Sequence, residues 1–349
     1  MKDKQKVLMI GLTPPEEGGS QRHIYEIAER IGEVTVLTQS GSSCTRKIEL
    51  PVLHTSPFIR NITFFISCLF YSIKLILVKK HDIIHIHENL LYILIPILKL
   101  RYNVIVTVHG ITGFKFYDNK ILWKIFGNSL KCADHLIAVS LEDEKLLKKE
   151  FKNLSYLPNG ADLSIYNKIS PKIEKKITFI GRVHEQKGII YLLEAFDSIK
   201  DKIPGYNLEI IGKVNDYALA LQEKYPDKRI IWKGFVSDRR SIVKSLKSAY
   251  CITLPSLWEG LPLTLFEALA SGRPVILSDI TVFKNITKDS AIYCKVKSSK
   301  DLANKLLLLI NDNKKAQHLG NKGKILSKSY DWQSIAGSTF KIYQELDKK

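Results

Sequence analysis

The stretch YCITLPSLWEGLPLTLFEALASGRPVIL, residues 250–277, decides the fold of this chain. It opens with an apolar run that is typical of a buried strand and that Pro255 ends. A loop containing glycine and proline then leads to a helix with a periodic apolar face from about Leu263, and a second apolar strand follows Pro274. This order predicts an open α/β sheet whose loop lies at the carboxyl end of the first strand, where such sheets bind their ligands.

Polar groups suited to a ligand surround the start of that helix. Free backbone N–H groups at Leu263, Thr264 and Leu265 would attract an anion, most often a phosphate. Glu259 lies just before the helix, and Glu267 lies about one turn inside it. Each carboxylate can accept hydrogen bonds from neighbouring hydroxyls of a sugar or a ribose. Glutamates are also common on exposed faces of helices that bind nothing, so the pair alone leaves the function open.

The full pattern around both glutamates, P-S-x-x-E-G-x-P-x-x-x-x-E-A-x-A-x-G-x-P-V, resembles the signature of the GT-B glycosyltransferases of family 4, the group 1 enzymes. The resemblance implies transfer of a sugar from a nucleotide-diphosphate sugar to an acceptor hydroxyl, with retention at the anomeric carbon. It implies that Glu259 contacts the donor sugar as a catalytic residue and that Glu267 binds the nucleotide ribose. The pattern does not specify the base, the sugar, the acceptor, the linkage or the oligomeric state.

Two further motifs in the second half of the chain match the same family. Arg182 and Lys187 lie in G-R-x-x-x-x-K-G, between a strand and a helix. Two cations five residues apart can flank one diphosphate, although basic residues are also common on surfaces that bind nothing. The segment around Gly234 and Phe235 resembles the loop that holds the nucleobase through backbone contacts. If these cations, the Gly19 amide and the helix start stabilise the leaving diphosphate, the reaction needs no metal.

The first half of the chain matches the family at fewer positions. Gly18, Gly19 and His23 form G-G-x-x-x-H between the first strand and a helix, where paired glycines let the backbone approach a diphosphate closely. The resemblance puts His23 on the acceptor side. His109 follows the predicted strand of residues 103–108, and the resemblance places it beside the donor sugar and the acceptor as a catalytic residue. A histidine that only completes the strand end is the alternative.

Other ligand classes find less support in the sequence. His85 and His87 share one face of a short strand, so a metal pair is conceivable. Their D-x-x-H-x-H run resembles a strand of the family without a metal role, however, and we predict no metal site. The first loop lacks G-x-G-x-x-G, which argues against a nicotinamide or flavin dehydrogenase. The nucleotide sugar is expected as a substrate, and no cofactor is expected.

The cysteine content and the net charge restrict which partners the protein can bind and in which compartment it can work. The five cysteines are scattered without a C-x-x-C pair, which favours a reducing compartment without disulfides or structural zinc. The net charge of +18 favours an anionic partner. No nucleic-acid-binding signature is present, which leaves anionic lipid headgroups, a phosphorylated acceptor, or a lysine-rich surface that only aids solubility. Residues 171–349 carry +12 of this charge, in the half assigned to the anionic donor.

The apolar segment Ile62 to Val78 is near transmembrane length. Lys74 and several polar residues inside it favour a helix packed on the sheet or lying on a membrane face over a spanning helix. Residues Met1 to Ile10 are too short for a signal peptide and predict a first strand. We therefore expect a cytoplasmic protein, peripheral on the inner face of the membrane if this helix contacts lipid. An acceptor in cell-surface polysaccharide or glycolipid synthesis, saccharide or lipid-linked, fits that location.

The predicted architecture is α/β, with two Rossmann-like domains facing each other across a cleft in the GT-B arrangement. A lysine-rich linker is expected across residues 163–176, and Trp332 is expected on the packing side of the last helix. The predicted domains are an acceptor-binding domain (1–168), a nucleotide-sugar-binding domain (169–329) and a C-terminal helix that packs back on the first domain (330–349).

Two other functions remain compatible with such a fold. A nucleotide-sugar epimerase or hydrolase would act on the donor alone and need no acceptor. A non-catalytic subunit would only bind the nucleotide sugar. The intact set of Glu259, Glu267, Arg182 and Lys187 argues against the second, because a protein without chemistry has no need for all four.

Overall fold

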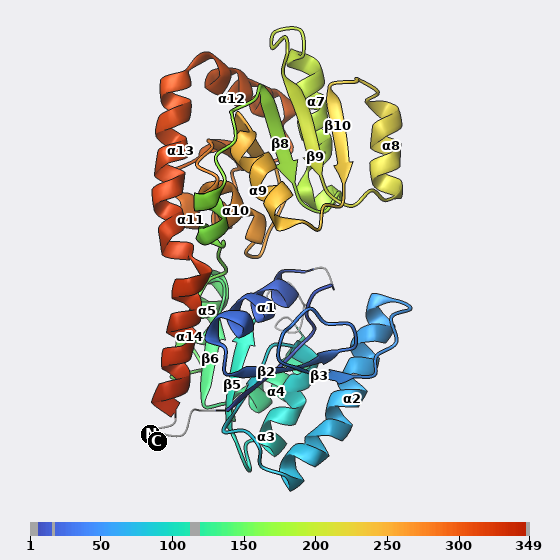
Figure 1. The fold of residues 1–349 in the computed structure, drawn as a ribbon, viewed down its shortest axis with the longest axis vertical. Coiled ribbons are helices and arrows are strands. Elements are labelled where there is room, and N and C mark those ends of the chain that lie inside the picture. Colours follow the sequence, from blue (N-terminus) through green and yellow to red (C-terminus); the bar gives the residue numbers. More distant parts are fainter. Residues whose placement is uncertain (1–5, 16–17, 112–118, 347–349) are drawn as a thin grey trace. The chain divides into compact units, whose positions relative to one another are not determined.

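The computed structural model describes residues 6–15, 18–111 and 119–346. The chain divides into two compact units, unit 1 with Met1–Asn159 and Trp332–Lys349 and unit 2 with Gly160–Asp331 (Figure 1). Each unit is built around one sheet of parallel strands. The predicted α/β class is therefore confirmed for both units.

Unit 1 contains a seven-stranded sheet in the order β3-β2-β1-β4-β5-β6-β7. Its strands are β1 (Val7–Ile10), β2 (Val34–Gln39), β3 (Lys47–Leu50), β4 (Ile83–Ile86), β5 (Asn103–Val108), β6 (His135–Ala138) and β7 (Leu154–Tyr156). All residues of β1 and β4 are buried, as expected for parallel strands covered on both faces. The strand order reverses between β1 and β4, so their carboxyl ends form the switch point at which open sheets bind ligands.

All but the last of the described helices of unit 1 lie between these strands in the chain. They are α1 (Gly19–Ile31), α2 (Pro57–Leu77), η1 (Asn89–Leu94), α3 (Ile95–Leu98), α4 (Lys120–Leu130), α5 (Leu141–Leu147) and α14 (Trp332–Leu346). Gly18 is the N-cap of α1, and no side chain caps this end of the helix. The paired glycines of the G-G-x-x-x-H motif therefore form the N-terminus of α1 itself.

Helix α2 contacts the rest of unit 1 along a narrow stripe. Its buried residues are Phe64, Cys68, Ser72 and Leu75, which recur every three or four positions and so share one face. Only 22% of its most apolar window is buried, and by length and composition α2 could cross a membrane. The predicted packing on the rest of the unit is thus limited to one face of α2. The rest of α2 presents exposed apolar side chains, among them Phe58, Phe70 and Leu77.

Unit 2 contains a six-stranded sheet in the order β10-β9-β8-β11-β12-β13. Its strands are β8 (Lys176–Ile180), β9 (Asn207–Ile211), β10 (Ile230–Gly234), β11 (Cys251–Leu254), β12 (Val275–Ser278) and β13 (Ile292–Cys294). Its helices are α6 (Leu163–Lys168), η3 (Glu185–Lys187), α7 (Ile189–Ile199), α8 (Asp216–Lys224), α9 (Arg239–Ser248), α10 (Leu263–Ala270), α11 (Thr281–Thr287), α12 (Ser299–Asn311), α13 (Asn313–Ser327) and η4 (Lys328–Tyr330). The order reverses between β8 and β11, which is the switch point of this unit.

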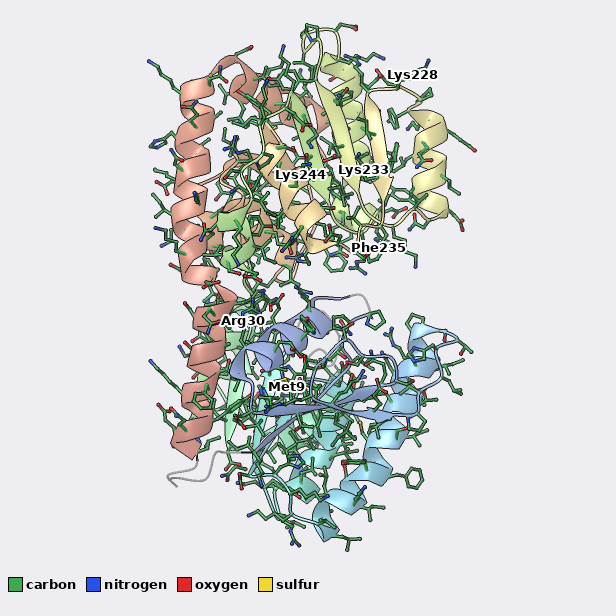
Figure 2. All side chains as sticks on the ribbon, in the orientation of Figure 1. Met9, Arg30, Lys228, Lys233, Phe235 and Lys244 are labelled. Atoms are coloured by element: carbon green, nitrogen blue, oxygen red, sulfur yellow. The ribbon has the colours of Figure 1, made fainter. Side chains whose placement is uncertain are left out.

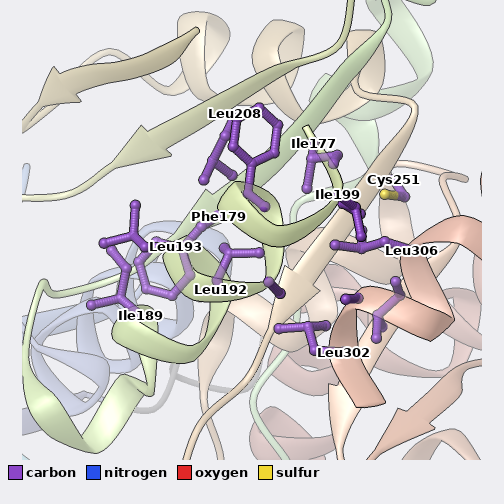
Figure 3. Close-up of a cluster of buried hydrophobic side chains, with 14 of the residues drawn as sticks. Ile177, Phe179, Ile189, Leu192, Leu193, Ile199, Leu208, Cys251, Leu302 and Leu306 are labelled. Atoms are coloured by element: carbon purple, nitrogen blue, oxygen red, sulfur yellow. The ribbon is translucent and has the colours of Figure 1, made fainter. Parts of the chain in front are cut away.

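Separate buried clusters hold the helices of unit 2 to its sheet. One cluster joins β8 to α7 and α12 through side chains such as Phe179, Leu193 and Leu306 (Figure 3). Another contains the buried residues of α10, among them Phe266, together with strand residues such as Leu254. Because α10 begins at Leu263 and β11 ends at Leu254, the strand–loop–helix unit predicted around residue 255 is present.

The predicted linker across residues 163–176 is wrong at its start, although residues 169–175 form no helix or strand. Residues 163–168 form α6, whose Tyr166 is buried in the core of unit 2. Unit 2 consequently begins at Gly160 rather than at 169 and ends at Asp331 rather than at 329. A helix of six residues is too short to show a 3.6-residue apolar period, so the sequence pattern gave no sign of it.

The predicted packing of the last helix on the first domain is confirmed. Trp332 and Tyr343 of α14 are buried, and α14 packs against α1. The Tyr343 hydroxyl lies 2.7 Å from Nδ1 of His85, and the Trp332 ring meets His23 edge-on at 5.3 Å between centroids. The C-terminal segment thus contributes side chains to the core beneath the β1/β4 switch point.

Candidate active site

In unit 2, the loop after β8 is packed against the segment that follows β11. Gly188 has φ +62°, and a Cβ on it would lie 2.0 Å from the carbonyl oxygen of Pro255. Only glycine combines that backbone conformation with such a close approach. The Leu257 amide donates to the Gln186 carbonyl at 2.7 Å, and Gln186 Nε2 donates to the Trp258 carbonyl at 3.0 Å. These contacts hold two motifs of the sequence side by side.

Lys187 and Glu259 meet at this junction. Lys187 Nζ lies 2.5 Å from Glu259 Oε1, and Ser256 Oγ donates to the same oxygen at 2.7 Å. The side chains of Lys187 and Glu259 are 12% and 6% exposed. Among the described residues, no donor reaches the second carboxylate oxygen of Glu259 within hydrogen-bonding distance. One acceptor atom of Glu259 and the remaining N–H groups of Lys187 are therefore available to a ligand.

Glu267 forms an ion pair with Arg239, a residue outside the motifs of the sequence. Arg239 Nη1 lies 2.6 Å from Glu267 Oε1, and the Glu267 side chain is 9% exposed. Asp238 caps the first turn of α9 through the amides of Arg240 and Ser241, which fixes the start of the helix that carries Arg239. Arg239 belongs to no motif recognised above, so only its three-dimensional position reveals it.

Tyr166 lies near the same carboxylate. Burial, together with the charge of Glu267, raises the pKa of Tyr166 well above its usual value. Its hydroxyl is buried and has no hydrogen-bond partner within the described part of the chain. Since α6 carries this residue, the segment expected to be a linker borders the Glu267 site.

The other residues predicted to bind the donor lie at the same edge of the unit 2 sheet. Phe235 follows β10 and is 59% exposed, and Figure 2 shows it at the end of that strand. Gly234 has φ +68°, a conformation that favours glycine. Arg182 is exposed and forms no ion pair with any residue that the structure describes. At the start of α10 the Leu265 amide bonds the Pro262 carbonyl at 3.1 Å, so the expectation of a free N–H at Leu265 is wrong.

In unit 1, three histidines gather at the β1/β4 switch point. His23 comes from α1, His87 follows β4 and His109 follows β5. His87 Nδ1 lies 3.0 Å from His109 Nε2, and the His23 and His109 rings meet edge-on with centroids 4.9 Å apart. His23 Nδ1 lies 2.9 Å from Asn159 Oδ1. No pattern in the sequence predicts that these residues form one cluster, because they lie far apart in the chain.

Burial keeps these imidazoles neutral. It lowers the pKa of His23 to about 4, partly offset by the Asn159 hydrogen bond, and it places the pKa values of His87 and His109 well below the usual range. His85 is also buried, but both of its ring nitrogens are engaged, by Tyr343 and by Thr107 at 2.8 Å. The conceivable His85–His87 metal pair is therefore not formed, because His85 has no lone pair to offer.

Gly18 and Gly19 are exposed at the N-terminus of α1. A Cβ on Gly19 would meet no described atom within 4 Å, so packing within the chain does not require glycine there. The predicted approach of this backbone to a diphosphate stays a prediction. Every role that combines residues of unit 1 with residues of unit 2 also stays a prediction.

Two family models together match most of the chain. Residues 165–325 match the family described as glycosyl transferases group 1, and residues 17–165 match the family described as glycosyltransferase family 4. The chain belongs to the group 1 glycosyltransferases. The predicted resemblance is thus confirmed by both halves, including the first half, where fewer motifs were recognised.

One curated relative is the UDP-Gal:α-D-GlcNAc-diphosphoundecaprenol α-1,3-galactosyltransferase of Escherichia coli. It is 33% identical over 240 residues, which cover 59% of this chain and 60% of that protein. The similarity to this relative therefore spans less than two thirds of its length.

Two solved structures share the fold of this group 1 glycosyltransferase. Sucrose-phosphate synthase from Thermosynechococcus elongatus has a TM-score of 0.79 at 19% identity and covers 98% of this chain and 99% of its own. The Anabaena protein HepE in complex with UDP has a TM-score of 0.79 at 14% identity, with coverage of 98% and 100%. At these identities the likeness shows the GT-B fold and nothing finer.

Proposed function

We propose that this protein transfers a glycosyl group from a nucleoside diphosphate sugar to a hydroxyl group of a saccharide or lipid-linked saccharide acceptor. The observation that carries the proposal is the junction of Lys187 and Glu259, with Ser256 on the same carboxylate oxygen. Removing the charged side chains of a lysine and a glutamate from water is unfavourable for the stability of the fold. A ligand with phosphate and hydroxyl groups can bind to both charged groups, so a binding role explains why they are buried together.

The junction supports distinct roles for the two residues. The ammonium of Lys187 has three N–H donors, and only one is needed for Glu259, so the others can contact a diphosphate oxygen. The free oxygen of Glu259 can accept from a sugar hydroxyl. Arg182, exposed and without an ion pair among the described residues, supplies the second cation for the leaving diphosphate. Charge that develops on that leaving group is stabilised by groups already in place.

The remaining donor contacts follow from the arrangement in unit 2. Glu267, held by Arg239, is proposed to bind the ribose, and Phe235 with Gly234 is proposed to border the base. Leu263 and Thr264 at the start of α10, with Gly18 and Gly19 at the start of α1, are proposed to supply backbone N–H groups. His109 is proposed to lie beside the donor sugar and the acceptor, with His23 on the acceptor side. The proposed reaction proceeds with retention and uses neither a metal nor a cofactor in the chemical step.

The proposed donor and acceptor classes have support among the relatives. The name of the Escherichia coli relative specifies UDP-galactose and a diphosphoundecaprenol-linked sugar, and the HepE structure contains UDP. We therefore propose a UDP-sugar first, and an acceptor in polysaccharide or glycolipid synthesis. A cytoplasmic site of action is proposed, since the five cysteines form no disulfide and suit a reducing compartment.

A membrane-facing surface on unit 1 extends the proposal. Phe58, Phe70 and Leu77 of α2 are 74%, 68% and 72% exposed. The neighbouring α3 contacts α2 and α4, and exposed apolar residues continue there at Ile97 and Ile121. Lysines and arginines lie in or next to the same helices, at positions 60, 74, 79, 80, 99, 101, 120 and 124. Apolar side chains among cations fit the inner, anionic face of a membrane, where a lipid-linked acceptor would be found.

The first test is a thermal-shift panel of UDP-, GDP- and ADP-sugars and their free diphosphates, with and without EDTA. A ligand at 100 times its dissociation constant adds about 2.7 kcal/mol of stability, so a selective rise would identify the donor class. Glu267→Ala should abolish the rise, whereas Glu223→Ala, an exposed change on α8, should retain it. A folded protein that responds to no nucleotide would contradict the donor site.

A product assay separates the proposed transferase from the other two functions. With the selected donor and a lipid-linked saccharide acceptor, the sugar should appear on the acceptor with its anomeric configuration unchanged by NMR. Release of free sugar or an epimerised donor without acceptor would indicate the hydrolase or epimerase. Binding without any turnover would indicate a non-catalytic subunit.

A further inference from the structure

The three clustered histidines of unit 1 present their ring nitrogens to a common point. One nitrogen from each of His23, His87 and His109 lies within 4.8 Å of those of the other two. They come from three separate elements, α1 and the ends of β4 and β5, which the parallel sheet brings together at its switch point. No described carboxylate or cysteine takes part in this group.

A ring nitrogen without a hydrogen-bond partner is present on two of these imidazoles, whereas His109 Nε2 is engaged with His87. His23 uses Nδ1 for Asn159, which leaves Nε2. His87 Nε2 is buried and has no hydrogen-bond partner among the described residues, an arrangement that is costly unless something else fills it. Because all three side chains are neutral near pH 7, a ligand need not displace a proton from the nitrogen it contacts.

The surroundings resemble those of a metal-binding histidine in a second respect. Such histidines usually pass their other N–H to a carbonyl or carboxylate, which fixes the tautomer and the ring orientation. Asn159 Oδ1 does this for His23, and the edge-on contact with Trp332 holds the same ring in place. His85, by contrast, has both ring nitrogens engaged by protein groups and has no nitrogen left for an ion.

The donor set selects the class of ion. Imidazole suits zinc, copper, nickel and related transition metals, whereas magnesium and calcium require oxygen ligands that this cluster lacks. A tetrahedral zinc with bonds of about 2.0–2.1 Å separates its ligand nitrogens by roughly 3.3 Å. The nitrogens, which lie within 4.8 Å of one another, need to approach by at most about 1.5 Å, which small rotations of the rings can supply.

We propose that His23, His87 and His109 form a binding site for one divalent transition-metal ion of the zinc type. Three protein ligands leave a fourth position open to water or a small ligand. An ion here takes the His109 nitrogen away from the sugar and the acceptor and breaks the His87–His109 hydrogen bond. Its effect on the proposed glycosyl transfer is therefore inhibition, which agrees with a chemical step that uses no metal. The binding itself does not depend on that proposed function.

The test uses the untagged full-length protein and calorimetric titration with Zn²⁺, with Co²⁺ and Mg²⁺ as further probes. We expect one Zn²⁺ per chain, visible absorption bands of four-coordinate Co²⁺, and no heat with Mg²⁺. Loss of an outer-shell partner typically costs 10–100-fold in affinity, and loss of a ligand should cost no less, so His87→Asn and His109→Asn should each lower it at least tenfold. His318→Asn, an exposed histidine on α13 in unit 2, is the matched control and should bind like the wild type.

Wild-type protein alone can also decide the matter if the cluster variants fail to fold. X-ray absorption of the zinc-loaded protein should show three imidazole nitrogens at about 2.0–2.1 Å. Fewer than three imidazoles, a sulfur neighbour, unchanged affinity in His87→Asn or His109→Asn, or no zinc binding would each overturn the proposal. Zinc binding without loss of transferase activity would overturn the inhibitory role and leave the site.

Discussion

The ammonium of Lys187 lies 2.5 Å from Oε1 of Glu259, although 72 residues separate them in the chain. Both side chains are largely buried, so removal of one partner leaves the other charge without compensation. We expect Glu259→Gln to destabilise the protein by about 3 kcal/mol, the lower end for a buried pair, and to abolish transfer. The double variant Lys187→Met/Glu259→Gln should recover most of that stability in urea unfolding and remain inactive. A double variant that regains activity would contradict the assignment of the pair to the substrate.

Arg239 is expected to support donor binding through Glu267. Arg239→Met removes a hydrogen bond between charged groups, a kind worth about 1.5–3 kcal/mol. The dissociation constant of the selected nucleoside diphosphate should rise at least tenfold, measured by calorimetry, corresponding to about 1.4 kcal/mol. Arg240→Met changes the exposed neighbour and should leave binding unchanged. Equal affinities in the two variants would remove Arg239 from the site.

Much of this arrangement was predictable from sequence, and the exceptions have a physical reason. The strand–loop–helix unit around residue 255 follows from apolar runs and turn residues that are contiguous in the chain. Arg239 was missed because its contact with Glu267 forms only when α9 packs beside α10, and no local pattern encodes that. The histidine cluster was missed for the same reason, since three elements bring its members together. Helix α6 was missed because it is too short to show a period.

Unit 1 should lose stability as the pH falls below about 6.5. The pKa of His23 is lowered to about 4 in the folded protein against 6.5 in an unfolded chain, so between these values the unfolded state binds more protons. At about 1.4 kcal/mol per pKa unit, His23 alone lowers stability at pH 5 by roughly 2 kcal/mol relative to pH 7. The melting temperature should fall accordingly, and less steeply in His23→Gln. An identical pH profile for both proteins would contradict the assignment.

Gly188 should tolerate no side chain. Gly188→Ala combines a left-handed backbone, which costs roughly 1–2 kcal/mol, with a Cβ only 2.0 Å from the Pro255 carbonyl oxygen. The total loss in urea unfolding should exceed about 3 kcal/mol, within the range of strongly disruptive single changes. Gly205→Ala is the matched control, with φ +78° but only Lys175 Cδ nearby at 3.8 Å. Gly205→Ala should therefore lose only the roughly 1–2 kcal/mol that the left-handed backbone costs. Similar losses in both variants would show that the close approach does not matter.

The surface of α2 should bind anionic vesicles. Wild-type protein is expected to sediment with vesicles that contain phosphatidylglycerol and much less with neutral phosphatidylcholine. Burying one phenylalanine contributes about 1.5–3 kcal/mol, so Phe58→Ser/Phe70→Ser should lower vesicle binding at least tenfold. Leu219→Ser, 49% exposed on α8 in unit 2, is the control and should bind normally. Unaltered binding by the double variant would place the lipid contact elsewhere.

The position of α14 has a consequence for how the protein is made. Unit 2 is one continuous segment that ends at Asp331, whereas unit 1 is complete only with Trp332–Leu346. On the ribosome, all of unit 2 has therefore been synthesised before the residues that cover His23 and His85 emerge. The usual order, in which the N-terminal domain folds first, is reversed for the final packing step here. Until α14 has been synthesised, His23 and His85 lack the contacts that Trp332 and Tyr343 give them.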